Sequence, residues 1–197
     1  EPADFIGKKI GVRLAGDEEL IYRAMMENAG IDASQVTEIP MKYDITPLLS
    51  GQVDVWNGYV TNEPIIAEEK GYDVNIIWPS EYGVNVSADT LFTTEKMIQN
   101  NPELVHRVVK ATIRGWEEAL ENPEQAVTYT LQYSDKLTRE HETKMMNASI
   151  PLVKPGNNSV GFMDRAVWVS MQDLLLKQGF MKQAVDIDKT FSTEFLP

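Results

Sequence analysis

One stretch of the sequence decides the expected fold: Val53-Asp-Val-Trp-Asn-Gly-Tyr-Val-Thr-Asn-Glu-Pro64. Its β-branched and aromatic residues are typical of a short strand, which we expect over Val53–Tyr59. Either Thr61 or Asn62 can cap a helix that follows, and Pro64 suits the first turn of that helix. The stretch therefore predicts a strand, a polar loop and a helix in direct succession.

Aromatic and polar side chains crowd around the carboxyl end of this strand, where small ligands bind in open α/β sheets. A further expected strand, Val74–Trp78, would bring Tyr82 to a neighbouring position, and Asp17 follows the first expected strand. The predicted ligand-binding residues are therefore Trp56, Asn57, Tyr59, Asn62, Glu63, Tyr82 and Asp17. The alternative is structural: Asn62 would cap the helix, and Glu63 would complement its dipole.

Strands alternate with helices in the first part of the chain. The expected strands are Lys9–Leu14, Val36–Met41, Val53–Tyr59 and Val74–Trp78. A turn at Ala15-Gly16-Asp17, with Asp17 as N-cap, leads into a helix that Gly30 ends. A short helix or a turn is expected over Ile45–Ser50, and a helix is expected over Ile65–Lys70. This alternation predicts an α/β fold with mostly parallel sheets.

The pattern changes after about Glu81. One or two strands are expected within Val84–Thr93, and the remainder is mostly helical. Asn-Pro pairs, with Asn as cap and Pro at the first helical position, mark two helix starts. The expected segments are helices from Asn101 and Asn122, a helix over Lys136–Ile150, a loop over Pro151–Val160, a helix over Met163–Gln178 and a mostly irregular tail over Asp186–Pro197 that has room for one short helical turn. Trp116 and Trp168 lie on apolar helical stripes and are expected in the core.

Composition excludes several classes of function. The 197 residues include 18 Lys and Arg against 30 Asp and Glu, a net charge of −12 that argues against nucleic acid and anionic membranes as partners. The chain has no cysteine, which excludes thiolate metal sites, and an acidic protein without cysteine suits a bacterial periplasm. No apolar run approaches the length of a membrane-spanning helix.

The usual motifs of catalysis and cofactor binding are lacking. His106 and His141 lie outside any metal-binding spacing, and the sequence has no phosphate-binding loop, dinucleotide fingerprint or nucleophile elbow. The carboxylates of Asp17, Glu18 and Glu19 would suit acid–base work, but a helix start explains them more economically. We therefore expect no metal, no cofactor and no catalytic residue.

An ordered set of motifs runs along nearly the whole chain. It comprises Asp4-Phe-Ile-Gly-Lys-Lys-Ile-Gly-Val12, Ala29-Gly-Ile-Asp32, Leu49-Ser-Gly-Gln-Val-Asp-Val55, Gly58-Tyr-Val-Thr-Asn-Glu-Pro64, Tyr82-Gly83, Leu91-Phe-Thr-Thr-Glu-Lys96, Asn101-Pro-Glu-Leu-Val105 and Thr112-Ile-Arg-Gly-Trp-Glu-Glu-Ala-Leu-Glu-Asn-Pro-Glu-Gln-Ala126. The set resembles the bacterial solute-binding proteins related to the pyrimidine-precursor synthase of thiamine biosynthesis. The stretch ending at Pro64 is similar to the branch that binds thiamine pyrimidines and riboflavin.

The resemblance implies a type II periplasmic-binding-protein fold, in which two α/β lobes are joined by crossing strands and enclose the ligand. Residues 1–83 would form the second lobe, and residues 84–197 would return to the first lobe as a mainly helical segment. Family members carry a longer N-terminal part, so the first lobe is expected to be incomplete. The stripe over Val105–Leu120 and the helix over Met163–Leu176 would then expose apolar surface, which favours either a homodimer, with or without exchanged elements, or a monomer of low stability.

The function implied by the resemblance is capture of a small heterocycle, a thiamine pyrimidine precursor or a flavin, for the permease of an ABC importer. The location would be periplasmic, or extracytoplasmic with membrane attachment through further segments. One alternative is the ligand-sensing input domain of a signalling protein. Another is an enzyme of the synthase type, whose histidine motif and lysine-bound pyridoxal phosphate belong to the N-terminal part; we therefore expect no enzyme activity here.

Overall fold

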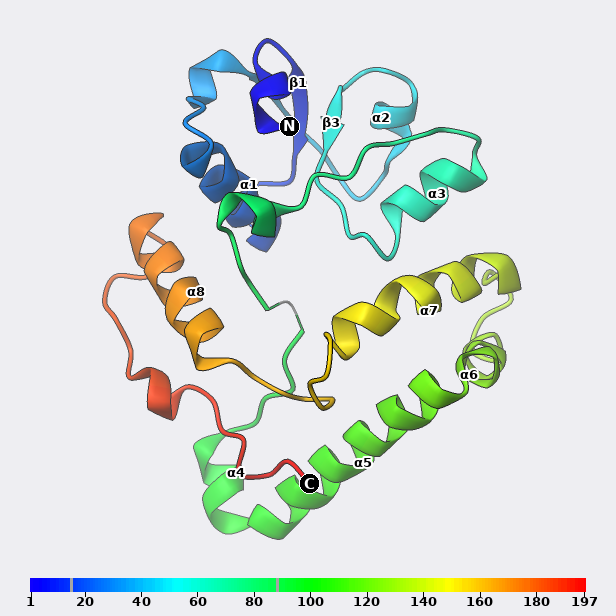
Figure 1. The fold of residues 1–197 in the computed structure, drawn as a ribbon, viewed down its shortest axis with the longest axis vertical. Helices are drawn as coiled ribbons and strands as arrows, with labels where there is room; N and C mark the ends of the chain where they lie inside the picture. Colours follow the sequence, from blue (N-terminus) through cyan, green and yellow to red (C-terminus); the bar gives the residue numbers. More distant parts are fainter. Residues whose placement is uncertain (15, 88) are drawn as a thin grey trace. The chain divides into compact units, whose positions relative to one another are not determined.

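The computed structural model describes residues 1–14, 16–87 and 89–197, so Ala15 of the expected turn and Ala88 of the expected strands lie outside the described residues. The chain forms two compact units, drawn in Figure 1. The first comprises Glu1–Val86 and Val169–Ala184, and the second comprises Ser87–Trp168 and Val185–Pro197. The assignment of residues 1–83 and 84–197 to the lobes of a binding protein stays a prediction.

A parallel sheet of three strands organises the first unit. The strands β1 (Lys9–Val12), β2 (Thr37–Pro40) and β3 (Val55–Trp56) lie in the order β2-β1-β3. Ile10 of the central strand is paired with Glu38 on one side and with Val55 on the other. The predicted α/β class, parallel pairing and first three strands are confirmed, although β3 is much shorter than the expected Val53–Tyr59.

Helices connect the three strands. α1 (Asp17–Asn28) and the 3₁₀ turn η2 (Ala33–Gln35) lead from β1 to β2, and α2 (Thr46–Leu49) leads from β2 to β3. α3 (Glu63–Glu69) follows β3. The N-cap of α1 is Gly16 without a side-chain bond, so the expectation of Asp17 as cap is wrong; Asp17 is the first helical residue, in a first turn of acids that suits the dipole.

The core of the first unit lies between the sheet and α1. Gly30 ends α1 in the left-handed conformation at φ 71°, as the sequence predicts, because glycine adopts it without Cβ strain. Buried apolar side chains from the sheet, α1 and the 3₁₀ turn η1 (Pro2–Phe5) pack together, with Leu174 against them. The principal members are Phe5, Ile10, Val12, Tyr22, Met25, Met26, Ile31 and Val84.

The strands expected over Val74–Trp78 and within Val84–Thr93 are wrong. Val74–Trp78 is irregular, and the described residues of Val84–Thr93 contain no strand; a 3₁₀ turn, η3 (Pro79–Tyr82), lies between these segments. Val74, Ile76 and Trp78 are exposed, so their apolar character does not reflect a buried strand. Trp78 and Tyr82 consequently do not follow a strand end.

Helices make up most of the second unit. They are α4 (Glu95–Asn100), α5 (Pro102–Glu121), α6 (Pro123–Thr130) and α7 (Arg139–Val153), with the 3₁₀ turn η4 (Ile187–Lys189) near the end of the chain. α8 (Arg165–Lys177) belongs to this unit up to Trp168 and to the first unit from Val169. Pro102 and Pro123 occupy first helical positions as predicted. The loop expected from Pro151 begins later, because α7 continues through Pro151 to Val153.

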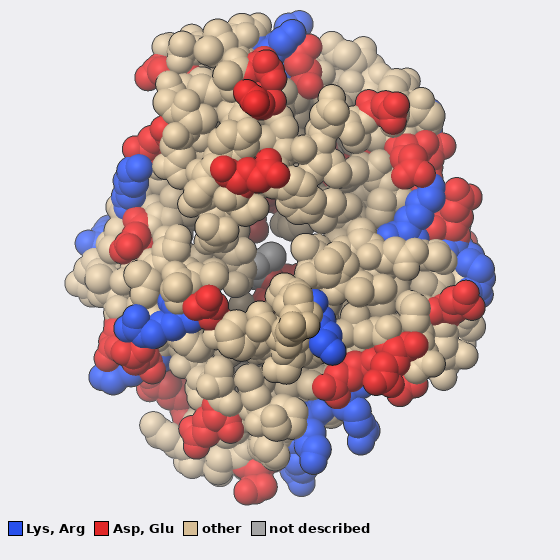
Figure 2. Space-filling model, in the orientation of Figure 1, with Lys and Arg blue, Asp and Glu red and all other residues tan. Residues whose placement is uncertain are grey.

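The surface of the second unit keeps several apolar side chains. Ile113 is the buried residue of α5, whereas Trp116 is 40% exposed, so its predicted place in the core is wrong. Trp168 is half-buried and stacks on Phe191 with 5.3 Å between ring centroids. On the face shown in Figure 2, acidic and basic side chains are interspersed. No helix in the described part of the chain is long and apolar enough to cross a membrane.

Candidate ligand-binding site

A shallow depression in the first unit lies at the carboxyl ends of all three strands. Its volume of about 240 Å³ includes space open to solvent. The lining residues are Gly11 and Arg13 around the end of β1, Met41, Lys42 and Tyr43 after β2, Trp56 and Asn57 at the end of β3, and Glu63 at the start of α3. The chain leaves the adjacent strands β1 and β3 at a point where the strand order reverses, which is where ligands bind in open α/β sheets.

The ring of Trp56 lies against Gly11 on the neighbouring strand. A Cβ atom at position 11 would be 2.9 Å from Cε3 of Trp56 and 3.2 Å from Cγ of Met41, closer than carbon atoms normally approach. Glycine is therefore what allows the half-buried indole to cover the central strand. This arrangement places an aromatic surface within the depression.

Arg13 supplies a cation to the lining and is held from two sides. The central carbon of its guanidinium lies 3.6 Å from the ring centroid of Tyr43, a cation–π contact with a side chain that is itself mostly exposed. Its Nη2 also forms an ion pair with Oε1 of Glu18 in the first turn of α1. The guanidinium is thus fixed between the loop after β2 and the helix after β1.

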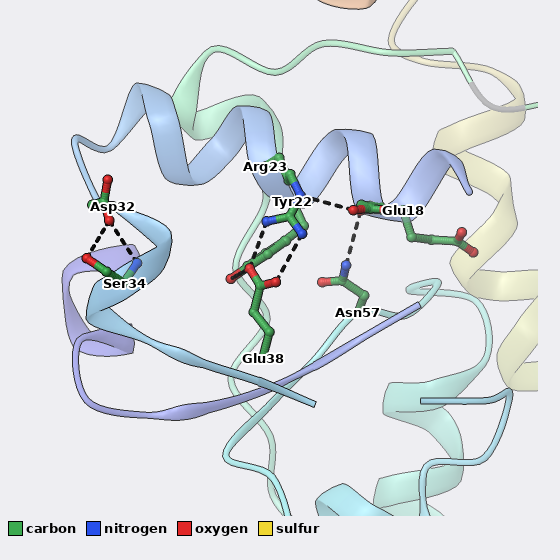
Figure 3. Close-up of polar contacts among 8 residues, drawn as sticks. Glu18, Tyr22, Arg23, Asp32, Ser34, Glu38 and Asn57 are labelled. Atoms are coloured by element: carbon green, nitrogen blue, oxygen red, sulfur yellow. Dashed lines mark hydrogen bonds and ion pairs between the residues drawn. The ribbon is translucent and has the colours of Figure 1, made fainter. Parts of the chain in front are cut away.

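Glu18 connects this loop region to the segment after β3. The hydroxyl of Tyr59 donates to Oε1 of Glu18 at 3.2 Å, and the side-chain amide of Asn57 donates to the Glu18 backbone carbonyl at 3.1 Å, a contact visible in Figure 3. Glu18 is only 8% exposed, and its Oε2 has no hydrogen-bond partner among the described residues. A buried carboxylate so placed is unusual, because buried polar atoms are normally paired.

Glu63 turns back toward its own loop. Its Oε2 accepts a 2.8 Å hydrogen bond from the backbone N–H of Tyr59, and its side chain lies 3.0 Å from where a Cβ on Gly58 would be. Glu63 therefore both braces the turn before α3 and lines the depression. Asn62 is the N-cap of α3 by position but makes no side-chain capping bond, which corrects the alternative in which its side chain caps the helix.

The structure brings three of the predicted site residues together in the lining: Trp56, Asn57 and Glu63. Tyr59 reaches the same region through its bond to Glu18. Asn62 is half-buried outside the lining, and Asp17 is exposed at the start of α1. Tyr82 lies in η3, where its carbonyl accepts from the side chain of Asn28 at 2.9 Å and where burial raises the pKa of its hydroxyl.

Sequence reasoning missed the residues that follow the other two strands. Lys42 and Tyr43 come directly after the expected strand Val36–Met41, and Arg13 lies near the end of the expected strand Lys9–Leu14. The rule that located Trp56 would have found them if it had been applied to every strand end. Glu18 gave no local signal, because acids in the first turn of a helix are common.

A metal centre has no support in the described ranges 1–14, 16–87 and 89–197, where no group of three or more His, Asp or Glu side chains could hold an ion. His106 and His141 are both half-buried on helices of the second unit. What the depression offers chemically is an aromatic surface surrounded by hydrogen-bond donors and acceptors, which suits binding of a small ring system.

Known proteins resemble this chain over most of its length. It is 25% identical over 202 residues to the riboflavin-binding protein RibY of Chloroflexus aurantiacus, covering 98% of this chain and 57% of that protein. It is 25% identical over 199 residues to the formylaminopyrimidine-binding protein of Halalkalibacterium halodurans, covering 98% of this chain and 60% of the relative. Residues 1–126 match the family described as NMT1/THI5 like. That match covers more than half of the chain and agrees with the resemblance seen in the motifs, so the chain belongs to the NMT1/THI5-like family.

Proposed function

We propose that this chain is a solute-binding protein that captures a small planar heterocycle, a thiamine pyrimidine precursor or a flavin, for an ABC importer. The observation that carries the proposal is the indole of Trp56, laid over Gly11 inside a depression at the carboxyl ends of three parallel strands. Flat rings stack favourably on such a surface, and the strand ends are where small ligands bind in this type of sheet.

The polar groups around the indole suit the edge of a heterocycle. Arg13 and Lys42 can only donate hydrogen bonds, whereas the carboxylate of Glu63 accepts them. Asn57 donates its amide to the backbone of Glu18, and its other side-chain atom is a carbonyl acceptor. Aminopyrimidine and isoalloxazine edges both alternate donors with acceptors, so either can be matched by this set.

The depression is small for a complete ligand site. Its volume of about 240 Å³ counts space that is open to solvent, so the depression encloses far less than the cavities in which small molecules are usually buried. We therefore infer that it forms one wall of the site. The chain spans less than two thirds of the length of the relatives named above, which leaves room for a second wall in the whole protein.

The relatives support the class of ligand and the absence of a catalytic step. One is named for binding riboflavin and the other for binding formylaminopyrimidine, and both ligands are planar nitrogen heterocycles. We infer the same class for this chain, an extracytoplasmic location and a permease as the receiving partner. We also infer that residues 1–83 form the second lobe of the binding protein and that residues 84–197 return to the first.

Direct titration tests the proposal. Isothermal calorimetry of the whole protein, which supplies the second wall, with riboflavin and, separately, with formylaminopyrimidine should show saturable binding of one of them at a single site, with quenching of tryptophan fluorescence. A cooperative thermal unfolding transition establishes that the protein used is folded. A folded whole protein that binds neither compound contradicts the proposed function.

A further inference from the structure

Glu18 is a buried acid that the proposed recognition of a ring does not by itself require. Its side chain does not line the depression, yet it forms an ion pair with Arg13, which does. A Cβ at Gly16 would meet Oε2 of Glu18 at 2.8 Å, so this oxygen is covered by the backbone at the start of α1. Burying a charge in this way is costly unless another charge compensates it.

Two features of the surroundings compensate the Glu18 charge. The guanidinium of Arg13 forms an ion pair with Oε1, and the amino-terminal end of α1 carries the positive end of the helix dipole. The pairing is mutual, because Glu18 neutralises the cation that Arg13 brings to the depression. Oε2 has no hydrogen-bond partner in the described part of the chain, so hydrogen bonding alone does not explain why Glu18 is buried here.

The formal charges of the lining residues and of Glu18, which pairs with one of them, sum to zero. Arg13 and Lys42 are positive, and Glu63 and Glu18 are negative. The neighbouring acid Glu19 belongs to a different cluster, because it pairs with Arg23 at 3.0 Å. Without Glu18, the guanidinium of Arg13 would be an uncompensated cation with several free donors, the arrangement that proteins use to bind phosphate.

We propose that Glu18 determines specificity: it holds Arg13 as a paired charge, keeps the depression neutral, and so favours a neutral ring ligand over its phosphorylated form. This inference rests on the proposed function and adds a property to the same site. A phosphate placed near Arg13 would also lie close to the buried Glu18 anion paired with it, and the repulsion offsets the attraction of the guanidinium.

The test compares two probes that differ by one phosphate, riboflavin and riboflavin 5′-phosphate, at low ionic strength. In E18Q, the affinity for the phosphate ester relative to that for riboflavin, taken as the ratio of the two dissociation constants, should rise at least tenfold, which corresponds to about 1.4 kcal/mol. Glutamine keeps an oxygen acceptor for Arg13 and Tyr59 but removes the charge. E19Q is the matched control, because it removes a carboxylate from the same helical turn; its ratio should equal that of the wild type. An unchanged ratio in folded E18Q overturns the inference.

A second variant acts in the opposite direction and covers the case in which E18Q does not fold. R13Q leaves the Glu18 charge unpaired, so the affinity of this variant for the phosphate ester relative to that for riboflavin should fall at least tenfold. The double variant R13Q/E18Q restores neutrality and should return the ratio toward that of the wild type. A ratio in R13Q that stays at the wild-type value or shifts toward the ester contradicts the proposed role of Glu18.

A measurement without any heterocycle separates this inference from the proposed function. Inorganic phosphate should shift the Arg13 Nε–H resonance of E18Q in nuclear magnetic resonance spectra at concentrations that leave it unchanged in the wild type and in E19Q. If the wild type binds neither riboflavin nor formylaminopyrimidine, the proposed function fails and the phosphate titration still reports on Arg13. Equal phosphate responses in the three proteins overturn the assignment of Glu18.

Discussion

Arg23 of α1 and Glu38 of β2 are joined by two hydrogen bonds of 2.8 and 3.0 Å, one to each oxygen of the carboxylate, as Figure 3 shows. The hydroxyl of Tyr22 donates to the same carboxylate at 3.2 Å. This cluster connects the first helix to β2, an outer strand of the sheet. Lys42 and Tyr43 of the depression lie in the loop that follows this strand.

The Arg23–Glu38 pair predicts a pH dependence of stability. Hydrogen bonding to Arg23 lowers the pKa of the Glu38 carboxyl below its ordinary value of 4.5. The stabilisation is therefore fully present above about pH 4.5 and is lost as the pH falls through the lower pKa of the folded state. Glu38→Gln should lower the free energy of unfolding by about 1–2 kcal/mol near neutral pH, measured by urea denaturation, and by less in acid.

The control for this pH effect is Asp188→Asn, which removes a partner of Arg165 at an exposed position. Exposed ion pairs contribute little to stability. The control should therefore unfold like the wild type at each pH, and an equal effect of the two substitutions would contradict the role given to Glu38.

Gly11→Ala should displace Trp56. The added methyl group would lie 2.9 Å from the indole, so the ring must move and the core must adjust, at an expected cost of about 1–3 kcal/mol in unfolding free energy. Tryptophan fluorescence and thermal unfolding measure the two effects. The matched control is Gly115→Ala in α5, where the added methyl meets no atom within 4 Å. There the substitution should stabilise the helix by about 0.5–1 kcal/mol.

Trp56→Ala tests the aromatic surface directly. Loss of the ring should weaken binding of the heterocycle by about 1–3 kcal/mol, from the apolar contact area and the stacking contribution. Calorimetry on folded protein measures it, with Trp116→Ala in the second unit as the control that leaves affinity unchanged. Unchanged affinity in the Trp56 variant would show that this ring is structural.

Glu63→Gln separates the two roles that this residue combines. A glutamine oxygen can still accept the hydrogen bond from the backbone of Tyr59, so the melting temperature should change little. Removal of the charge should weaken binding at least tenfold, or about 1.4 kcal/mol, if the carboxylate accepts a charge-assisted bond from a ligand amine. A variant that binds normally but melts earlier would assign Glu63 to the turn alone.

The exposed apolar side chains of α5 predict self-association. Leu104, Val108 and Trp116 are 41%, 47% and 40% exposed, and their spacing of four and eight residues places them along one row of the helix. Light scattering should report a dimer at micromolar concentration, and Val108→Asp should shift it toward monomer. Val74→Asp, at an exposed position of the first unit, is the control. A wild-type chain that is monomeric at these concentrations contradicts the dimer.

Local signals were sufficient where one segment determines its own structure. The Asn-Pro pairs located the starts of α5 and α6, because the fixed backbone angle of proline acts within one turn; Asn101 and Asn122 are N-caps by position but make no side-chain capping bond. Gly30 located the end of α1 for the same reason. Pro151 misled the prediction, since a proline removes only one hydrogen bond and the last turn of α7 continues past it.

Signals that depend on distant partners were not available from the sequence. Val74–Trp78 has strand-like residues, but a strand forms only where a neighbouring strand can pair with it, and none does so in the described residues. Trp116 has the spacing of a core residue, but its exposure depends on which element covers α5. In the site, Trp56 could be predicted from its own strand, whereas Glu18 becomes notable only when Arg13, Asn57 and Tyr59 meet around it.

The contact between Gly11 and Trp56 links two positions that are far apart in the sequence. A side chain at the first position crowds an indole at the second, so a larger residue at position 11 is expected to accompany a smaller one at position 56. Glycine at position 11 with tryptophan at position 56 indicates a site with a broad, flat aromatic surface. Covariation of these two positions therefore offers a way to sort members of the family by the size of the ring they accommodate.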